Sequence, residues 1–87
     1  MQVDKGDLLR RLRKIEGQVR GVQRMIEEDR YCMDILVQLA AIKSATNSIG
    51  LAILEGHTKR CVSDAIRSGN GEEAINEMME VLRSFVK

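Results

Sequence analysis

Cysteine and histidine, the side chains with the richest metal and redox chemistry, are scarce in this chain. It contains two cysteines, Cys32 and Cys61, and one histidine, His57. Residues four apart lie on one face of a helix with Cβ atoms about 6 Å apart, so His57 and Cys61 can share a small ligand. Two thiolates and one imidazole form a soft donor set that suits Cu(I) and suits Mg²⁺ or Ca²⁺ poorly. We therefore predict a soft-metal or thiol-sensing site at these three residues.

Other metals fit this donor set less well. Structural Zn²⁺ takes four ligands, so a carboxylate or water would have to join the two thiolates and the imidazole. A nickel or cobalt site rich in imidazole is not expected from a chain with a single histidine. A metal-bound imidazole also needs a hydrogen-bond partner for its second nitrogen, and Tyr31 and Glu77 are candidates for that role. From the pattern alone, an ordinary solvated position on the third helix is the favoured interpretation of Glu77.

Composition indicates where these thiols act. The chain of 87 residues is expected to form one small domain, 1–87, whose core is marginal unless it oligomerises. No apolar run of membrane-spanning length and no signal-peptide pattern is evident, so we expect a soluble cytoplasmic protein with no membrane partner. Thiols stay reduced in the cytoplasm, which favours metal ligands, redox sensors or core residues over a structural disulfide.

Three helices are expected to position these side chains. The second runs roughly over 30–67, because no proline or turn cluster interrupts it before Gly69, which suits its C-terminal cap. We expect Asp29 to be its N-cap, and Asn70 to start the third helix. The first spans about 5–28, where apolar residues alternate spacings of four and three: Leu8, Leu12, Ile15, Val19, Val22 and Ile26.

A long second helix keeps the two cysteines of one chain apart. They are 29 residues apart in the sequence, which is about 43 Å along a continuous helix. An antiparallel partner helix would instead place Cys32 of one protomer beside His57 and Cys61 of the other, with a two-fold axis near Thr46. We therefore predict an all-α fold and an antiparallel dimer with a four-helix-bundle core. Small residues near that axis permit close helix approach: Ala40, Ala41, Ser44, Ala45, Ser48, Gly50 and Ala52.

Positive charge is concentrated in the first helix. Residues 1–24 carry seven basic and three acidic side chains, although the net charge of the whole chain is only +1. A basic stripe is often no more than a solvated face. Charge segregation and two-fold repetition favour a polyanion instead, and the lack of an aromatic platform favours duplex DNA over single strands. Side chains on the outer arc are Arg10, Arg13, Lys14, Arg20 and Arg24.

The chain closely resembles the CsoR/RcnR family of bacterial transcriptional repressors, in particular its copper-sensing CsoR branch. The resemblance covers nearly the whole chain. It is carried by Arg-Leu-Arg-Lys-Ile-Glu-Gly-Gln-Val-Arg-Gly at 11–21, by Tyr-Cys-Met-Asp-Ile at 31–35 and by His-Thr-Lys-Arg-Cys at 57–61. It implies that Cys32, His57 and Cys61 bind Cu(I) between protomers, and that Tyr31 and Glu77 are hydrogen-bond partners of the histidine.

The same resemblance implies a function. The expected protein is a homotetramer, a dimer of dimers, which binds operator DNA without metal and releases it on binding Cu(I), so that copper export or chaperone genes are expressed. The DNA contacts are expected on the first helix. Some relatives carry a basic residue where this chain has Ser48, so no contact is inferred there. The residues assigned to DNA are Arg10, Arg11, Arg13, Lys14 and Arg20.

Sensing branches of the family differ in their ligands. Nickel and cobalt sensors use further histidines, including one near the N-terminus, where this chain has Gln2 and Val3. Formaldehyde-sensing relatives lack the cysteine at position 61, and persulfide-sensing relatives lack the histidine at position 57. We predict a regulator and not an enzyme. Two alternatives stay open: a thiol, persulfide or electrophile-responsive repressor using Cys32 and Cys61, and a helical copper-binding module without a DNA role.

Overall fold

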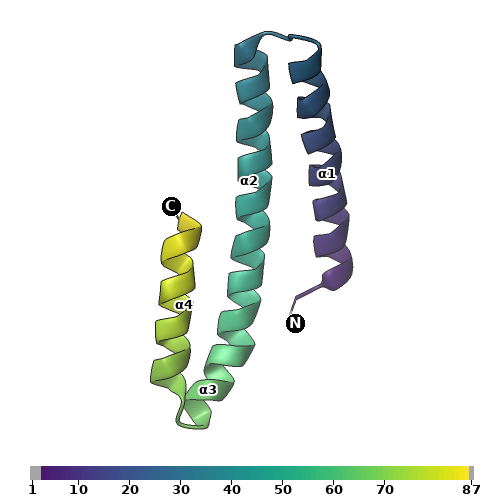
Figure 1. Cartoon of the computed structure of the whole chain (residues 1–87). Coiled ribbons are helices and arrows are strands. Elements are labelled where there is room, and N and C mark those ends of the chain that lie inside the picture. The colour runs from purple at the N-terminus through teal and green to yellow at the C-terminus, as the bar shows by residue number, and fades with distance from the viewer. Residues whose placement is uncertain (1–2, 87) are drawn as a thin grey trace. The chain divides into compact units, whose positions relative to one another are not determined.

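A computed structural model describes residues 3–86, and all regular secondary structure within them is helical (Figure 1). Gln2, whose identity argues against a nickel or cobalt sensor, lies outside the described residues. The chain divides into two compact units, which comprise residues 3–53 and 54–86 of the described part and are treated separately below. The helices are α1 (Lys5–Glu27), α2 (Cys32–His57), α3 (Ser63–Arg67) and α4 (Gly71–Val86), with a π-helical turn, η1 (Thr58–Val62), between α2 and α3.

Helical backbone is continuous over Cys32–Arg67, because α2, η1 and α3 follow one another without a break. The expected long helix over 30–67 is therefore confirmed, with one difference. Its regular α-helical hydrogen bonding is interrupted by the π turn at Thr58–Val62, which the hydrophobic pattern does not reveal.

The turn between α1 and α2 corrects one prediction. Asp29 does not cap α2; it has a φ of 53°, in the left-handed region, and terminates α1. Its amide donates to the Ile26 carbonyl at 3.1 Å, and the Arg30 amide donates to the Met25 carbonyl at 2.9 Å. These two bonds form a Schellman motif. Aspartate is one of the few non-glycine residues that adopt the left-handed conformation at low cost. Asp29 therefore ends α1 in this conformation and does not serve as the N-cap of α2.

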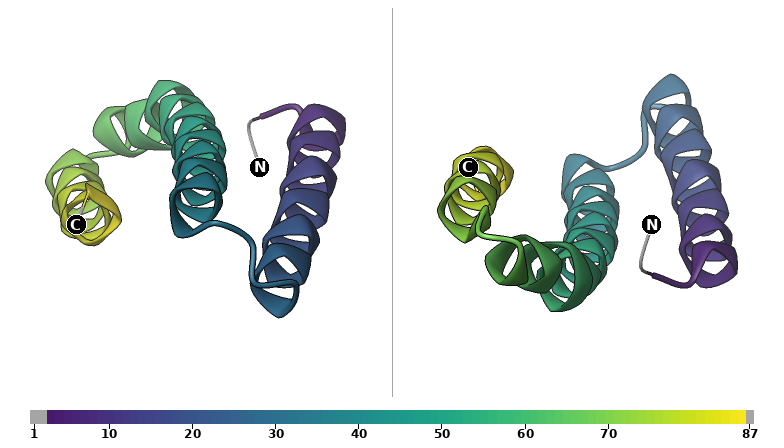
Figure 2. Two further views of the ribbon diagram at one scale, coloured as in Figure 1. Left: turned by 90° about the horizontal axis from the view of Figure 1, so that it is seen from above. Right: turned by 90° about the horizontal axis from the view of Figure 1, so that it is seen from below.

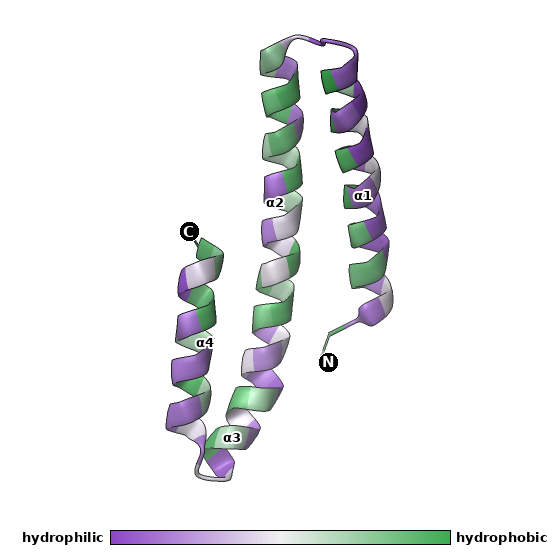
Figure 3. Ribbon diagram, viewed as in Figure 1, coloured by the Kyte–Doolittle hydropathy of each residue, from purple (hydrophilic) through white to green (hydrophobic). Residues whose placement is uncertain are grey.

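In the unit of residues 3–53, α1 and α2 run antiparallel and side by side (Figures 1 and 2). Apolar residues of α1 lie along its edge toward α2, and polar residues lie along the opposite edge (Figure 3). The stripe predicted on α1 separates into two rows of seven-residue spacing. Leu8 and Val22 belong to the first row and are each 6% exposed, whereas Leu12 and Val19 belong to the second and are each 42% exposed.

The α2 helix is apolar on more than one face. By length and composition alone, Cys32–Arg67 qualifies as a segment that could cross a membrane, contrary to the sequence-based expectation. Long apolar helices of soluble assemblies pass the same test. Leu36, Val37 and Leu51 on this helix are all exposed, so the described chain leaves much of its apolar surface without a covering layer.

The unit of residues 54–86 is built on a tight turn between α3 and α4. Gly69 has a φ of 89°, and a second Schellman motif forms around it: Gly69 donates to the Ile66 carbonyl at 3.2 Å and Asn70 to the Ala65 carbonyl at 2.7 Å. The predicted cap at Gly69 is confirmed. Gly71 then begins α4 so close to α3 that a Cβ atom there would lie 2.6 Å from Ile66 Cγ1.

Burial within residues 3–86 is limited. The buried apolar side chains are Leu8, Val22, Ile49 and Val62, and no side chain in this range is less than 2% exposed. A compact domain of this length buries a smaller share of its unfolded surface than a larger domain does. The described fold therefore lacks a core of the size that an independent domain needs.

Candidate metal centre and nucleic-acid interface

The three soft donors lie in two units of the chain. Cys32 is the first residue of α2, in the unit of residues 3–53, and is exposed. His57 ends α2 and is half-buried, and Cys61 lies in η1 and is exposed; both belong to the unit of residues 54–86. Both thiols are free. Among residues 3–86, no three His, Cys, Asp or Glu side chains are grouped closely enough to hold a metal ion.

The π turn governs the geometry around Cys61. It begins directly after His57 and contains Cys61, so the spacing of the two donors is set by i→i+5 hydrogen bonding and not by the α-helical repeat. Val62, only 4% exposed, anchors the turn beside this thiol. Single π turns within α-helices occur frequently at functional sites. The sequence reading placed His57 and Cys61 on a regular helix and missed this feature.

Helix α4 is joined to the π turn by a side-chain hydrogen bond. The Thr58 hydroxyl donates to Met78 Sδ at 3.3 Å. Thr58 follows His57 in the sequence, and Met78 follows Glu77. Within the described residues His57 and Glu77 are not hydrogen-bonded to each other, and Glu77 is exposed. The assignment of Glu77 to the histidine therefore stays a prediction.

Tyr31 is exposed and immediately precedes α2. Its backbone carbonyl accepts from the Ile35 amide at 3.2 Å, so this residue occupies the cap position that was expected for Asp29. The role of the Tyr31 phenol as a partner of the histidine also stays a prediction.

Charges beside the π turn are paired. Lys59 Nζ lies 2.9 Å from Glu55 Oε1. This hydrogen bond, with the attraction between the two charges, lowers the pKa of Glu55 and raises the pKa of Lys59. Both residues are therefore ionised near neutral pH and offset each other. The pair contributes no net charge to the surface next to Cys61.

The basic residues of α1 lie on its solvent side, with one exception. Arg10, Arg13, Lys14 and Arg20 are exposed, as the sequence predicts. The side chain of Arg11 is only 33% exposed. Its Nη2 donates to Ser48 Oγ at 2.8 Å, which ties α1 to α2.

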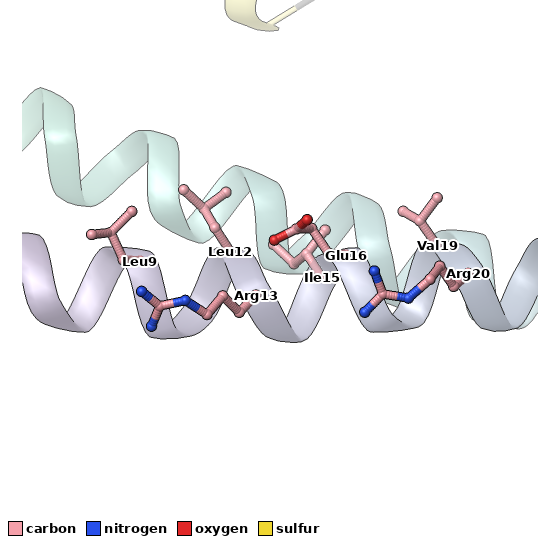
Figure 4. Close-up of a pocket in the computed structure, with 7 residues that line it drawn as sticks. All are labelled: Leu9, Leu12, Arg13, Ile15, Glu16, Val19 and Arg20. Atoms are coloured by element: carbon pink, nitrogen blue, oxygen red, sulfur yellow. The ribbon is translucent and has the colours of Figure 1, made fainter.

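An apolar groove runs along α1 beside this basic face. Figure 4 shows Leu12 and Val19 pointing to one side of the helix, with Arg13 and Arg20 along its edge. Of the apolar stripe predicted on α1, the row that contains Leu12 and Val19 is thus left open in the described chain.

These features define a class of protein: a small all-helical chain with soft metal donors, a basic first helix and a core that is incomplete on its own. The family comparison is specific. The model described as "Metal-sensitive transcriptional repressor" matches residues 4–84, and the chain belongs to this family. The expected resemblance and the all-helical fold class are thereby confirmed.

Individual relatives refine this placement. The chain is 51% identical over 84 residues to the copper-sensing transcriptional repressor CsoR of Bacillus subtilis (strain 168), an alignment that covers 97% of this chain and 83% of the relative. The crystal structure of the copper-sensing repressor CsoR with Cu(I) from Geobacillus thermodenitrificans NG80-2 matches with a TM-score of 0.88 and 50% identity, covering 94% of this chain and 85% of that one.

A third relative shows what the fold does not decide. The nickel-responsive transcriptional regulator InrS matches with a TM-score of 0.81 and 36% identity, covering 98% of this chain and 96% of that one. Proteins named for copper and for nickel therefore share this fold. Metal selectivity has to be argued from the donor set.

Proposed function

We propose that the protein is a Cu(I)-responsive transcriptional repressor in the cytoplasm. The observation that carries this proposal is the pairing of a soft donor set with similarity over nearly the full length to copper-sensing repressors. Cys32, His57 and Cys61 are the proposed ligands, with Tyr31 and Glu77 as partners of the imidazole. A single histidine argues against an imidazole-rich nickel site.

Oligomerisation completes both the core and the site. The uncovered row of α1 (Leu12, Val19 and Ile26) and the exposed apolar residues of α2 are surfaces that a second copy of the chain would bury. In an antiparallel dimer each donor site combines Cys32 of one protomer with His57 and Cys61 of the other. Two such dimers form the proposed homotetramer.

Protein, and not lipid, is the proposed cover for α2. Lys43 lies near the middle of this helix and is exposed, and a charged side chain at the centre of a bilayer is costly. Polar residues follow Lys43 in the same turns: Ser44, Thr46, Asn47 and Ser48. A buried helix of a soluble assembly accommodates them more readily, since hydroxyls and amides there find partners or solvent.

Operator DNA is the proposed partner of the basic face. Arg10, Arg11, Arg13, Lys14 and Arg20 are assigned to its phosphates. Such contacts lose affinity steeply with added salt, because binding releases counterions from the DNA.

Induction requires that the metal-bound protein favours a conformation with low DNA affinity. Cys32, His57 and Cys61 would hold Cu(I), and the bound ion would link these three donors. The Thr58 to Met78 hydrogen bond connects the turn that carries Cys61 with α4, so α4 is the proposed second element of the response. A coupling free energy of about 3 kcal/mol would change operator affinity about 100-fold.

An anaerobic titration tests this function. Purified protein is bound to a labelled duplex from its own upstream region, and Cu(I), Zn²⁺, Ni²⁺ and a persulfide donor are added in separate arms. Release by Cu(I) alone supports the proposal. Release by the persulfide alone would instead support the thiol-responsive alternative, which the two exposed free thiols favour. Absence of duplex binding under all conditions would support a copper-binding module without a DNA role.

A further inference from the structure

Arg11 is held differently from the other basic residues of α1. Its Nη2 donates to Ser48 Oγ on α2 at 2.8 Å, and its Nη1 lies 3.6 Å from Asp7 Oδ2 one turn earlier on α1. The guanidinium is thus fixed between two helices of the same unit. Arg13, Lys14 and Arg20 have no such tether within the described residues.

A pocket of about 390 Å³ opens beside this tether, between α1 and α2. Its polar lining combines two cations and one amide from α1, Arg11, Lys14 and Gln18, with two hydroxyls from α2, Ser44 and Ser48. Cations beside hydroxyl donors form a donor set suited to a tetrahedral oxyanion. Since no carboxylate lines the pocket, the oxyanion meets no opposing charge among its lining residues.

The tether leaves donors available for such an anion. A guanidinium has five N–H donors and no acceptor, so the bond to Ser48 and the approach to Asp7 occupy only part of its capacity. The Ser48 hydroxyl accepts from Arg11 and keeps its own proton. Within residues 3–86 it donates that proton to no other group, so Arg11 and Ser48 can both donate to one phosphate.

We propose that this pocket receives one backbone phosphate of the operator, and that Ser48 is the positioning residue that holds Arg11 ready for it. The inference rests on the proposed operator binding and adds a residue to which no DNA role was assigned. Arginine loses much rotational freedom when it is ordered. A side chain that is ordered before DNA arrives avoids most of that loss on binding.

The test measures duplex affinity of the full-length protein, without metal, by fluorescence anisotropy over a range of salt concentrations. Ser48→Ala is expected to weaken binding about threefold to tenfold, the range for releasing one long side chain. Ser48→Thr keeps the hydroxyl and is expected to restore binding to within about twofold of the wild type. Because the contact is to a phosphate, the same loss is expected on an unrelated duplex.

Arg11→Ala tests whether Ser48→Ala weakens duplex binding through Arg11. It removes a charge, so the slope of the logarithm of the binding constant against the logarithm of salt concentration is expected to fall by about one for each engaged site. Ser48→Ala keeps the charge and is expected to leave this slope unchanged. In an Arg11→Ala background, Ser48→Ala is expected to cause no further loss. Ser84→Ala, an exposed serine of α4, serves as the matched control.

The outcomes separate the two proposals. Wild-type affinity of Ser48→Ala, or a full additional loss in the Arg11→Ala background, would overturn the positioning role while leaving operator binding intact. Failure of the wild type to bind either duplex overturns the proposed function and this inference with it. Circular dichroism and Cu(I) uptake of each variant show that an affinity loss does not come from unfolding.

Discussion

The two units of the chain differ in the regularity of their helices. In residues 3–53, α1 and the larger part of α2 are uninterrupted α-helices, and α1 carries its apolar residues in seven-residue rows. In residues 54–86, a π turn, a helix of five residues and a glycine-dependent turn follow in quick succession. The regular unit carries the basic surface, and the irregular unit carries His57 and Cys61. The proposed DNA contacts and two of the three proposed ligands thus lie on backbones of different character, whereas Cys32 belongs to the regular unit.

This difference has a physical basis. Regular helices hold charges at fixed intervals, which suits the regular spacing of phosphates on a duplex. A π turn departs from the i→i+4 hydrogen bonding of the α-helices on either side of it, and such turns occur frequently at functional sites. The proposed ligands His57 and Cys61 therefore lie beside and within an irregular turn of the helix.

Removing a thiol is expected to have the largest effect. Cys32→Ala and Cys61→Ala each delete one of three proposed ligands, so Cu(I) affinity is expected to fall by more than about 100-fold, beyond the loss typical of removing a ligand's hydrogen-bond partner. Duplex affinity without metal should stay close to the wild type, because neither substitution removes a basic side chain of α1. Competition with a Cu(I) chelator measures the first quantity, and anisotropy measures the second.

Mixing the two thiol variants tests whether a site spans two protomers. A heterodimer of Cys32→Ala with Cys61→Ala contains one intact site and one site that lacks both thiols, so part of the Cu(I) capacity should return. If the mixture binds no more Cu(I) than its separate components, the three donors do not come from two chains in the proposed way.

Glycine substitutions contrast the two units directly. Gly71→Ala places a Cβ atom 2.6 Å from Ile66 Cγ1, and this overpacking is expected to lower the free energy of unfolding by about 1–3 kcal/mol. Gly17→Ala, on α1, meets no atom within 4 Å and is expected to raise it by up to about 1 kcal/mol through better helix propensity. Urea denaturation of both variants at one protein concentration measures the difference. An equal loss of unfolding free energy in the two variants would contradict the predicted difference between the two units.

Neutralising exposed arginines is expected to have a smaller effect, confined to DNA. Arg13→Ala and Arg20→Ala each remove one charge beside the apolar groove of α1, so each should weaken duplex binding several-fold and lower the salt slope by about one per engaged site. Cu(I) affinity should not change. An unaltered salt dependence in the double variant would remove these two residues from the interface.

Most of the helices could be predicted from the sequence, and the features that could not be predicted have specific physical causes. The apolar period predicted the helices, and Gly69 marked the end of the long one. Asp29 was misassigned because aspartate suits both an N-cap and a left-handed C-terminal position, and hydrogen bonds decide between them. The π turn at Thr58–Val62 was not predicted, because a single turn of five residues is too short to change the apolar period of a long helix noticeably.

The candidate site also combines residues that the sequence identifies with a contact that only the structure reveals. Cys32, His57 and Cys61 stand out by residue type alone, because the chain has no other cysteine or histidine. The Arg11 to Ser48 hydrogen bond joins residues 37 apart in the sequence, and only the packing of α1 against α2 brings them together. Apolar periodicity and local motifs span only a few residues, so they do not predict a contact between residues so far apart in the sequence.

The hydrogen bond between Thr58 and Met78 gives the smallest and most selective prediction. Thr58→Val preserves the shape of the side chain and removes the donor, and a single such bond is worth about 1 kcal/mol or less. Copper affinity and metal-free DNA binding should change little, whereas the ratio of DNA affinities with and without Cu(I) should fall by up to about fivefold. Met78→Leu removes the acceptor and should reproduce this effect without adding to it in the double variant. Because both residues lie in the irregular unit, a reduced ratio would locate the coupling there, and an unchanged ratio would mean that α4 takes no part in the response through this bond.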